Sequence, residues 1–270
     1  MSQDGVLPVI SVVMAAYNEE RNIGRAIESI LHQTFSEWEL IIVNDGSRDA
    51  TTDVVQHYAK NDSRIRLVIN SKNLGLPASL NIGIGLAKAE IIARADADDI
   101  NLPERFAKQY EYMQAHSDID VLGTSAILLD AQCKPINILS LPQTHGELKN
   151  LTFLKTHFIH PSVMIRKSFF NKIGMYDLSF PRVQDKELWL RGLRAGCRYA
   201  NLSEPLIEYS TNGYVRSWRS IRMIVLSQLR LVHVYRVKYG YYLVFISLII
   251  FILIKLNVYK RKSLRGSAHC

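Results

Sequence analysis

Residues 91–99 read I-I-A-R-A-D-A-D-D, an apolar run that breaks into three carboxylates at Asp96, Asp98 and Asp99. Such a run is typical of a strand buried in a parallel sheet, and ligands collect at the carboxyl ends of these strands. Because three acids within four residues repel one another, the pattern favours a hard divalent cation held by oxygen ligands, with bound phosphates completing its shell. The alternative is a solvated turn that caps a helix beginning near Pro103.

Four short apolar runs alternate with segments whose apolar residues recur at helical spacing. The runs lie at residues 9–14, 40–43, 66–69 and 90–95, and the helical segments lie at 23–31, around 54–58 and at 77–88. Strands that alternate with helices of this length predict βαβ units. The fold class is therefore α/β, with a doubly wound, mostly parallel sheet.

After residue 102 the pattern becomes mixed α+β, and we expect this half to complete the same sheet. It predicts helices at 103–116, 143–157 and 185–195, a strand at 121–129 that enters a hairpin, a strand-like run at 160–165, and two short strands near Tyr199 and Ile207. No internal repeat and no Gly/Ser/Pro-rich linker is present in the sequence. We expect one domain over residues 1–212 and a tail over residues 213–270.

The tail is strongly basic. Eleven of the 33 Lys and Arg residues follow Glu208, whereas none of the 25 acidic residues does. This asymmetry points to a polyanionic partner, either a membrane surface or nucleic acid. The uncharged run Y-Y-L-V-F-I-S-L-I-I-F-I-L-I at residues 241–254 is too apolar for a nucleic-acid arm, so it favours the membrane.

The apolar run is short for a membrane span. A helix of this length reaches about 21 Å, whereas the hydrocarbon core measures about 30 Å. A monotopic helix keeps both basic flanks at the anionic cytoplasmic leaflet, whereas a single span through residues 239–258 places one of them outside. We expect peripheral or monotopic attachment to the cytoplasmic face of the inner membrane, with a single pass or a buried core helix as alternatives.

The cysteines and the first residues favour the cytosol for the catalytic part. Cys133, Cys197 and Cys270 are few and widely spaced, which argues against a disulfide framework and for a reducing compartment. The N-terminus has no basic n-region, and its apolar stretch at residues 9–16 is too short for a signal peptide.

Two more polar clusters follow predicted strands, and we expect them to share one crevice with the aspartates. Tyr17 and Glu19 follow the first strand, and Asp45 with Gly46 follows the second. Such a crevice suits a nucleoside diphosphate: Tyr17 would cover the base, Asp45 would accept the base imide N–H, and a metal on Asp98 would bridge the phosphates. The alternatives are a loop aromatic and an ordinary turn with helix capping.

Other motifs carry less information. Gly83-Ile84-Gly85 is an incomplete dinucleotide fingerprint inside an amphipathic helix, and the aspartates at 96–99 lack the glycine and glutamate of an EF-hand. Asp185 begins a predicted helix, where it is either an N-cap or a general base that projects into the crevice.

Together the motifs resemble family 2 glycosyltransferases of the GT-A fold. The matching pieces are S-V-V-M-A-A-Y-N-E-E from Ser11, I-I-V-N-D-G-S-R-D from Ile41, K-N-L-G from Lys72, A-R-A-D-A-D-D from Ala93, H-P-S-V-M-I-R from His160 and Q-D-K-E-L-W-L-R from Gln184. They occur in family order over about the first 210 residues.

The resemblance implies an inverting transfer of one sugar from a UDP-sugar to an acceptor hydroxyl, helped by Mn²⁺ or Mg²⁺. By motif, Asp45 would contact the uracil, Asp96 and Asp98 would form the D-x-D pair, and Asp185 would be the catalytic base. Tyr17, Glu19 and Lys72 would also lie on the donor side. Asp98 is the expected direct metal ligand, whereas Asp96 would support the ribose or the metal.

Two departures from the family pattern shape the expected activity. Gln184 stands where the family usually has Glu, so no acidic role is assigned there. The Q-x-x-R-W element and spanning helices of the processive synthases are missing, which disfavours a polymerising enzyme. We expect an acceptor saccharide linked to a lipid, of the undecaprenyl-diphosphate kind used in O-antigen and capsule synthesis. The alternatives are a nucleotidyltransferase and an inactive nucleotide-sugar-binding protein; nucleic acid is not expected as a partner.

Overall fold

The computed structural model describes residues 7–130, 132–151, 156–210, 218–235 and 244–245. The chain divides into two compact units, one made of residues 1–151 and 156–214, the other of residues 152–155 and 215–270. The expected boundary at residues 212 and 213 falls within 211–217, outside the described residues.

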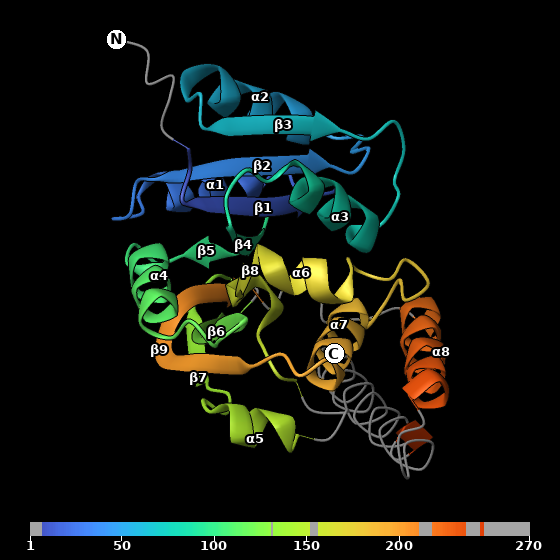
Figure 1. Cartoon of the computed structure of the whole chain (residues 1–270). Helices are drawn as coiled ribbons and strands as arrows, with labels where there is room; N and C mark the ends of the chain where they lie inside the picture. The colour runs from blue at the N-terminus through green and yellow to red at the C-terminus, as the bar shows by residue number, and fades with distance from the viewer. Residues whose placement is uncertain (1–6, 131, 152–155, 211–217, 236–243, 246–270) are drawn as a thin grey trace, which may run out of the picture. The chain divides into compact units, whose positions relative to one another are not determined.

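The first unit is built on one nine-stranded sheet among the described residues (Figure 1). Its order is β3-β2-β1-β4-β8-β6-β9-β5, with β7 paired to β6. The strands are β1 (Ile10–Ala16), β2 (Trp38–Asn44), β3 (Ile65–Ile69), β4 (Ile91–Asp96), β5 (Ile100–Asn101), β6 (Val121–Leu129), β7 (Pro135–Leu139), β8 (Met164–Arg166) and β9 (Tyr199–Ser210). As predicted, the second half of the chain completes the sheet begun by the first.

The expectation of a mostly parallel sheet is correct only for the first four strands. These pair in parallel because a helix crosses between each strand and the next. Beyond β4 the chain forms a β6–β7 hairpin, and β8 runs antiparallel to both of its neighbours. The β6–β9 pair is again parallel. The sheet is thus mixed, and the half that contains β1 to β4 is parallel.

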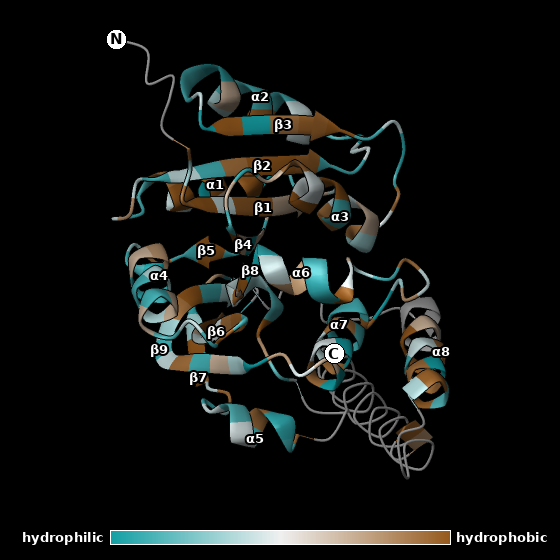
Figure 2. Cartoon of the chain, in the orientation of Figure 1, coloured by the Kyte–Doolittle hydropathy of each residue, from teal (hydrophilic) through white to brown (hydrophobic). Residues whose placement is uncertain are grey.

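Helices cover both faces of the sheet. The described helices of this unit are α1 (Ile23–Leu31), α2 (Thr51–Asn61), α3 (Leu76–Leu86), α4 (Arg105–Ala115), α5 (His145–Lys149), α6 (Lys167–Ile173) and α7 (Gln184–Arg194), with a 3₁₀ turn η1 (His160–Ser162). Alternate residues of β1 point to opposite faces. Val12 belongs to the core cluster that includes residues of α1, α2 and α4, whereas Val13 belongs to the cluster that includes residues of α3, α6 and α7. Figure 2 shows the apolar character of β1 and β2.

The second unit is described through helix α8 (Trp218–Tyr235) and residues 244–245. Leu226 and Val234 are exposed on α8, eight residues apart and so on one helical face. Within the described ranges, no helix is both long enough and apolar enough to cross a membrane. The predicted membrane segment at residues 239–258 lies outside the described residues except for 244 and 245.

The two glycines of the G-I-G sequence lie inside α3, so they do not form a nucleotide-binding turn. A Cβ atom on Gly83 would lie 2.5 Å from Cγ1 of Val13, whereas a Cβ on Gly85 would meet nothing within 4 Å. Gly83 therefore allows α3 to approach the sheet closely, and Gly85 does not have this function.

We predict opposite effects on stability when each of these glycines is replaced by alanine. Gly83→Ala should destabilise the protein by about 1–3 kcal/mol, because Val13 is β-branched and cannot move aside cheaply. Gly85→Ala should be neutral or stabilising by up to about 1 kcal/mol, because alanine favours the helix. Urea unfolding of both variants measures the difference, and equal free energies of unfolding would contradict the packing argument.

Candidate functional site

The loops that follow β1 and β2 are joined by hydrogen bonds. The Asn18 N–H donates to Ser47 Oγ at 2.9 Å, and the Arg48 N–H donates to Asn18 Oδ1 at 2.9 Å. The Glu19 N–H donates to Thr51 Oγ1 at 2.8 Å. Asn18 adopts a positive φ of 56°, which asparagine tolerates better than most residues. Two of the predicted clusters thus meet at one edge of the sheet.

Asp45 is buried and closes the loop that follows β3. Its carboxylate accepts hydrogen bonds from Asn70 Nδ2 at 2.9 Å and from the Leu74 and Gly75 N–H groups at 2.8 Å. Burial alone would raise the pKa of Asp45, but these donors and Ser79 outweigh it and lower the pKa. The structure shows Asp45 as an organiser of the loop, and its contact with a nucleotide base stays a prediction.

Tyr17 and Lys72 are exposed beside these loops. Tyr17 directly follows β1 and leaves 43% of its surface accessible, and the Lys72 side chain is also exposed. Gly46, at φ +70°, packs so closely on the backbone of Lys72 and Asn73 that a Cβ would lie 2.7 Å from the Lys72 carbonyl carbon. The turns after β2 and β3 therefore touch, and only glycine fits at their contact.

Asp96, Asp98 and Asp99 form one cluster at the end of β4. One oxygen of each carboxylate lies within 4.8 Å of the others. Burial, followed by the charges of Asp96 and Glu19, raises the pKa of Asp98 to about 6. Burial, followed by the charges of Asp96 and Asp98, raises the pKa of Asp99 to about 8. The cluster therefore holds negative charge that the fold only partly compensates.

Asp99 contributes more than a helix cap. Its side chain is 3% exposed, and Oδ1 accepts the Ser210 N–H from β9 at 2.9 Å. Its Oδ2 is buried without a hydrogen-bond partner among the described residues. Buried carboxylate oxygens without partners are costly, and a divalent cation with oxygen ligands would satisfy them. The residues present thus fit Mn²⁺ or Mg²⁺.

Glu19 belongs to the same acidic cluster. Burial raises the pKa of Glu19, Asn22 lowers it through a hydrogen bond of 2.9 Å, and the charges of Asp96 and Asp49 raise it further. The structure thus brings this predicted donor-side residue beside the aspartates.

Arg94 is the main cationic partner of this cluster, and it was not predicted from the sequence. It forms an ion pair with Asp96, although its own side chain is only 5% exposed. Its Nε and Nη1 atoms are buried and have no hydrogen-bond partner among the described residues. The signal in the sequence is an arginine inside the apolar run I-I-A-R-A, where a buried charge requires an acidic neighbour.

Asp185 lies in the first turn of α7, and its role as a base stays a prediction. Val183, the residue before the helix, has a positive φ of 55°, which is rare for a β-branched side chain. Burial raises the pKa of Tyr176, and the charges of Asp185 and Asp96 raise it further. Tyr176 therefore lies within electrostatic range of both the predicted base and the acidic cluster.

Tyr176 and His160 form a hydrogen-bonded pair that sequence reasoning did not single out. His160 Nε2 lies 2.8 Å from the Tyr176 hydroxyl oxygen. Burial lowers the pKa of His160 well below its ordinary value, so its imidazole is neutral at physiological pH. His160 stands in the H-P-S-V-M-I-R stretch, but its partner lies 16 residues away in an unpatterned loop.

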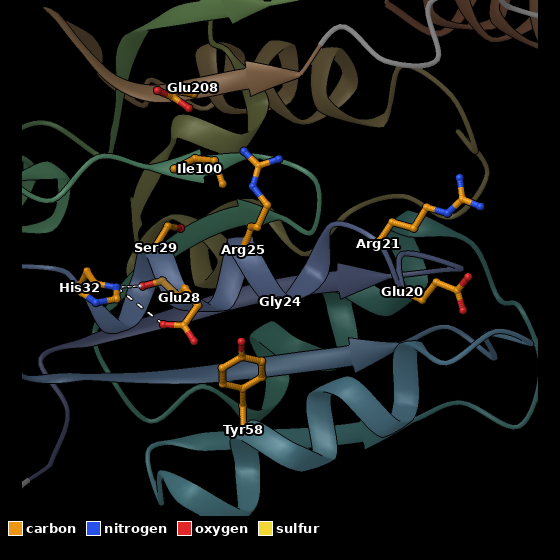
Figure 3. A pocket seen from close by; sticks show the side chains of 10 residues that line it. All are labelled: Glu20, Arg21, Gly24, Arg25, Glu28, Ser29, His32, Tyr58, Ile100 and Glu208. Atoms are coloured by element: carbon orange, nitrogen blue, oxygen red, sulfur yellow. Dashed lines mark hydrogen bonds and ion pairs between the residues drawn. The ribbon is translucent and has the colours of Figure 1, made fainter. Parts of the chain in front are cut away.

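A separate groove of about 550 Å³ lies along α1 (Figure 3). Its lining includes Arg21, Arg25 and Glu28, with Tyr58 from α2 and Glu208 from β9. None of the predicted donor, metal or base residues lines it. Because α1 and α7 cover opposite faces of the sheet, this groove is not the predicted catalytic crevice.

Comparison with known proteins identifies the family. The family described as "Glycosyl transferase family 2" matches residues 11–174, more than half of the chain. The O-antigen biosynthesis glycosyltransferase WbnJ of Escherichia coli is 36% identical over 208 residues, which are 76% of this chain and 80% of WbnJ. An Escherichia coli UDP-Gal:alpha-D-GlcNAc-diphosphoundecaprenol beta-1,3-galactosyltransferase is 27% identical, with 93% of this chain and 91% of that protein covered.

A solved structure shares the fold. The mannosyltransferase PcManGT from Pyrobaculum calidifontis, in complex with GDP-Man and Mn²⁺, superposes with a TM-score of 0.61 at 16% identity. The match covers 84% of this chain and 65% of PcManGT. The resemblance inferred from the motifs is thereby confirmed: the chain is a glycosyltransferase and belongs to glycosyl transferase family 2.

Proposed function

We propose that this enzyme transfers one sugar, with inversion, from a UDP-sugar to a lipid-linked saccharide during the synthesis of O-antigen-type or capsule-type polysaccharide. The observation that carries the proposal is the cluster of Asp96, Asp98 and Asp99 at the end of β4, whose carboxylate oxygens lie within 4.8 Å of one another. WbnJ supports the polysaccharide context. The relative that acts on a diphosphoundecaprenol acceptor supports a UDP-sugar donor and a lipid-linked acceptor.

The donor would bind at the edge where the loops after β1 to β4 meet. Tyr17 would cover the base, Asp45 would fix the base-binding loop, and Glu19, Lys72 and Asp96 would line the ribose and diphosphate. Asp98 and Asp96 would hold Mn²⁺ or Mg²⁺, with Asp99 beside them. When bound, the cation neutralises charge on the departing diphosphate.

Asp185 would act as the general base. The acceptor hydroxyl oxygen attacks the anomeric carbon, the bond from that carbon to the diphosphate breaks, and Asp185 takes the hydroxyl proton. Inversion requires the attacking oxygen and the leaving group on opposite sides of the sugar. Base and metal ligands should therefore come from different segments, as α7 and the end of β4 are.

The basic tail at residues 213–270 would attach the enzyme to the cytoplasmic face of the inner membrane. All eleven cations after Glu208 lie in this tail, and no acid opposes them there. Each Lys or Arg near an anionic surface contributes about 1 kcal/mol to binding. Peripheral or monotopic attachment is favoured over a single pass. Each of these modes of attachment would keep the enzyme near lipid-linked acceptors.

We predict that Asp98→Asn and Asp185→Asn both lower kcat, by roughly 10²–10⁴-fold for loss of the base. Only Asp98→Asn should weaken Mn²⁺-dependent UDP binding in calorimetry. Released UDP indicates sugar transfer, whereas pyrophosphate would indicate a nucleotidyltransferase. Absence of turnover in the wild type across UDP-sugars and lipid-diphosphate acceptors would favour an inactive binding protein.

The raised pKa values predict how stability depends on pH. Unfolded aspartates titrate near pH 4, whereas Asp98 and Asp99 titrate near 6 and 8 in the folded chain. The folded state therefore holds extra protons, and the stability that they contribute is lost as pH rises from about 4 to 8. In EDTA the melting temperature should fall over this range, and Mn²⁺ should raise it more at pH 8 than at pH 5.

Asp99→Asn is the control for this titration, because it removes the ionisation near pH 8 and should flatten the upper part of the EDTA curve. Parallel EDTA and Mn²⁺ curves in the wild type would contradict a metal site at the cluster.

Truncation tests the membrane role. Deleting residues 239–270 should move the protein from the membrane fraction to the supernatant and raise KM for a lipid-linked acceptor, while a water-soluble acceptor analogue is used as before. The result would contradict the proposal if the truncated enzyme still sediments with membranes and uses the lipid acceptor as well as the full chain does.

A further inference from the structure

The His160–Tyr176 pair has no role in the mechanism described so far. The hydrogen bond measures 2.8 Å, and the two rings lie 5.7 Å apart at 63°. Tyr176 is 4% exposed, so its hydroxyl must find its partner inside the protein.

The Tyr176 side of the pair is fixed to α3. The Tyr176 N–H donates to Asn81 Oδ1 at 3.0 Å, and Asn81 Nδ2 donates to the Tyr176 carbonyl at 2.9 Å. These reciprocal bonds span 95 residues of sequence. The backbone of Tyr176 is therefore held in place independently of its hydroxyl.

The loop before Tyr176 is also fixed to α7. Arg191 donates to the carbonyls of Ile173, Gly174 and Met175, the last two at 3.2 and 2.8 Å. Glu187 holds the same guanidinium through bonds of 2.8 and 2.9 Å. These bonds fix the loop to α7, the helix that carries Asp185 in its first turn.

The His160 side of the pair is fixed to β4. His160 begins η1, and the carbonyl of Val163, which follows it, accepts the Arg94 N–H at 2.9 Å. Arg94 in turn forms the ion pair with Asp96. The His160 ring also lies 6.1 Å from Trp189, one helical turn after Asp185 on α7.

The hydrogen bond thus joins the loop that is bonded to the helix carrying Asp185 to the turn that is bonded to the strand carrying Asp96. We propose that His160 and Tyr176 are positioning residues whose hydrogen bond sets the distance between the base and the donor site. The proposal rests on the proposed role of Asp185 as the base. Because a displacement of about 1 Å can slow an oriented reaction by roughly 10²-fold, loss of this bond should act on kcat.

Tyr176→Phe tests the bond, because it removes only the hydroxyl and keeps the packed ring. The assay uses the full chain with Mn²⁺, a lipid-diphosphate saccharide, and whichever of UDP-glucose, UDP-galactose and UDP-GlcNAc the wild type accepts. We expect kcat to fall roughly 10- to 100-fold, within the effect of such a displacement. KM for the donor and the calorimetric Kd for UDP with Mn²⁺ should change less than about twofold, because the acidic cluster is untouched.

Substitutions of His160 test the same hydrogen bond from its other partner. His160→Gln places an amide near the position of Nε2, and because an amide both donates and accepts, it should restore most of kcat. His160→Leu has no polar group and should match Tyr176→Phe. The double variant Tyr176→Phe/His160→Leu should be no slower than either single variant, since all three break the same bond.

Tyr112→Phe is the matched control. Tyr112 on α4 stacks on His116, the residue that follows this helix, with ring centroids 4.0 Å apart, and neither residue is among the predicted site residues. Its kcat should equal that of the wild type.

Three outcomes would overturn the proposal: Tyr176→Phe with unchanged kcat, a loss of UDP–Mn²⁺ affinity as large as the loss of kcat, or a His160→Gln variant as slow as His160→Leu. The role of Asp185 fails separately. Full activity of the Asp185→Asn variant would contradict both the proposed role of Asp185 as the base and the positioning proposal. If Asp185→Asn is inactive and Tyr176→Phe is fully active, only the positioning proposal is contradicted.

Discussion

The repulsion among the carboxylates at the end of β4 is the constraint on which the site depends. Two unit charges about 4 Å apart repel by about 4 kcal/mol at an effective dielectric constant of about 20. Oxygens of Asp96, Asp98 and Asp99 lie within 4.8 Å of one another. Two features reduce their repulsion: the buried guanidinium of Arg94, which pairs with Asp96, and the raised pKa values of Asp98 and Asp99, which keep protons on these carboxyl groups. The apo site is thus the less stable form, and a divalent cation would relieve it.

The proposed donor side and the proposed acceptor side of the site are built in different ways. The donor side consists of successive strand ends, so contacts between neighbouring loops, such as Asn18 to Ser47, are enough to assemble it. The acceptor side depends on long-range bonds such as Asn81 to Tyr176, which connect α3 to the loop before α7. The position of Asp185 therefore depends on packing in the second half of the chain, whereas the loops after β1 and β2 are joined by bonds between neighbouring loops.

The same difference decides what the sequence could predict. Strands β1 to β4 and the three aspartates follow from buried apolar runs, which are local signals. The two short strands expected near Tyr199 and Ile207 are one strand, β9, because register shifts near Ser125 let it bend while it stays paired to β6. Of the helix expected at residues 143–157, the structure forms α5 at His145–Lys149, and residues 152–155 lie outside the described residues. Arg94 and the His160–Tyr176 bond escaped prediction because their partners are set by tertiary packing.

The start of α7 shows the same dominance of tertiary packing over local preference. Val183 adopts a left-handed backbone that costs a β-branched residue about 1–3 kcal/mol, and it does so one residue before the helix that carries Asp185. Such a conformation persists only when the surroundings hold it, and here Arg191 and the packing of Trp189 hold the helix. Relaxing Val183 would turn the first residues of α7 away from their present direction. The left-handed backbone of Val183 is therefore maintained by the packing of α7 and not by local preference.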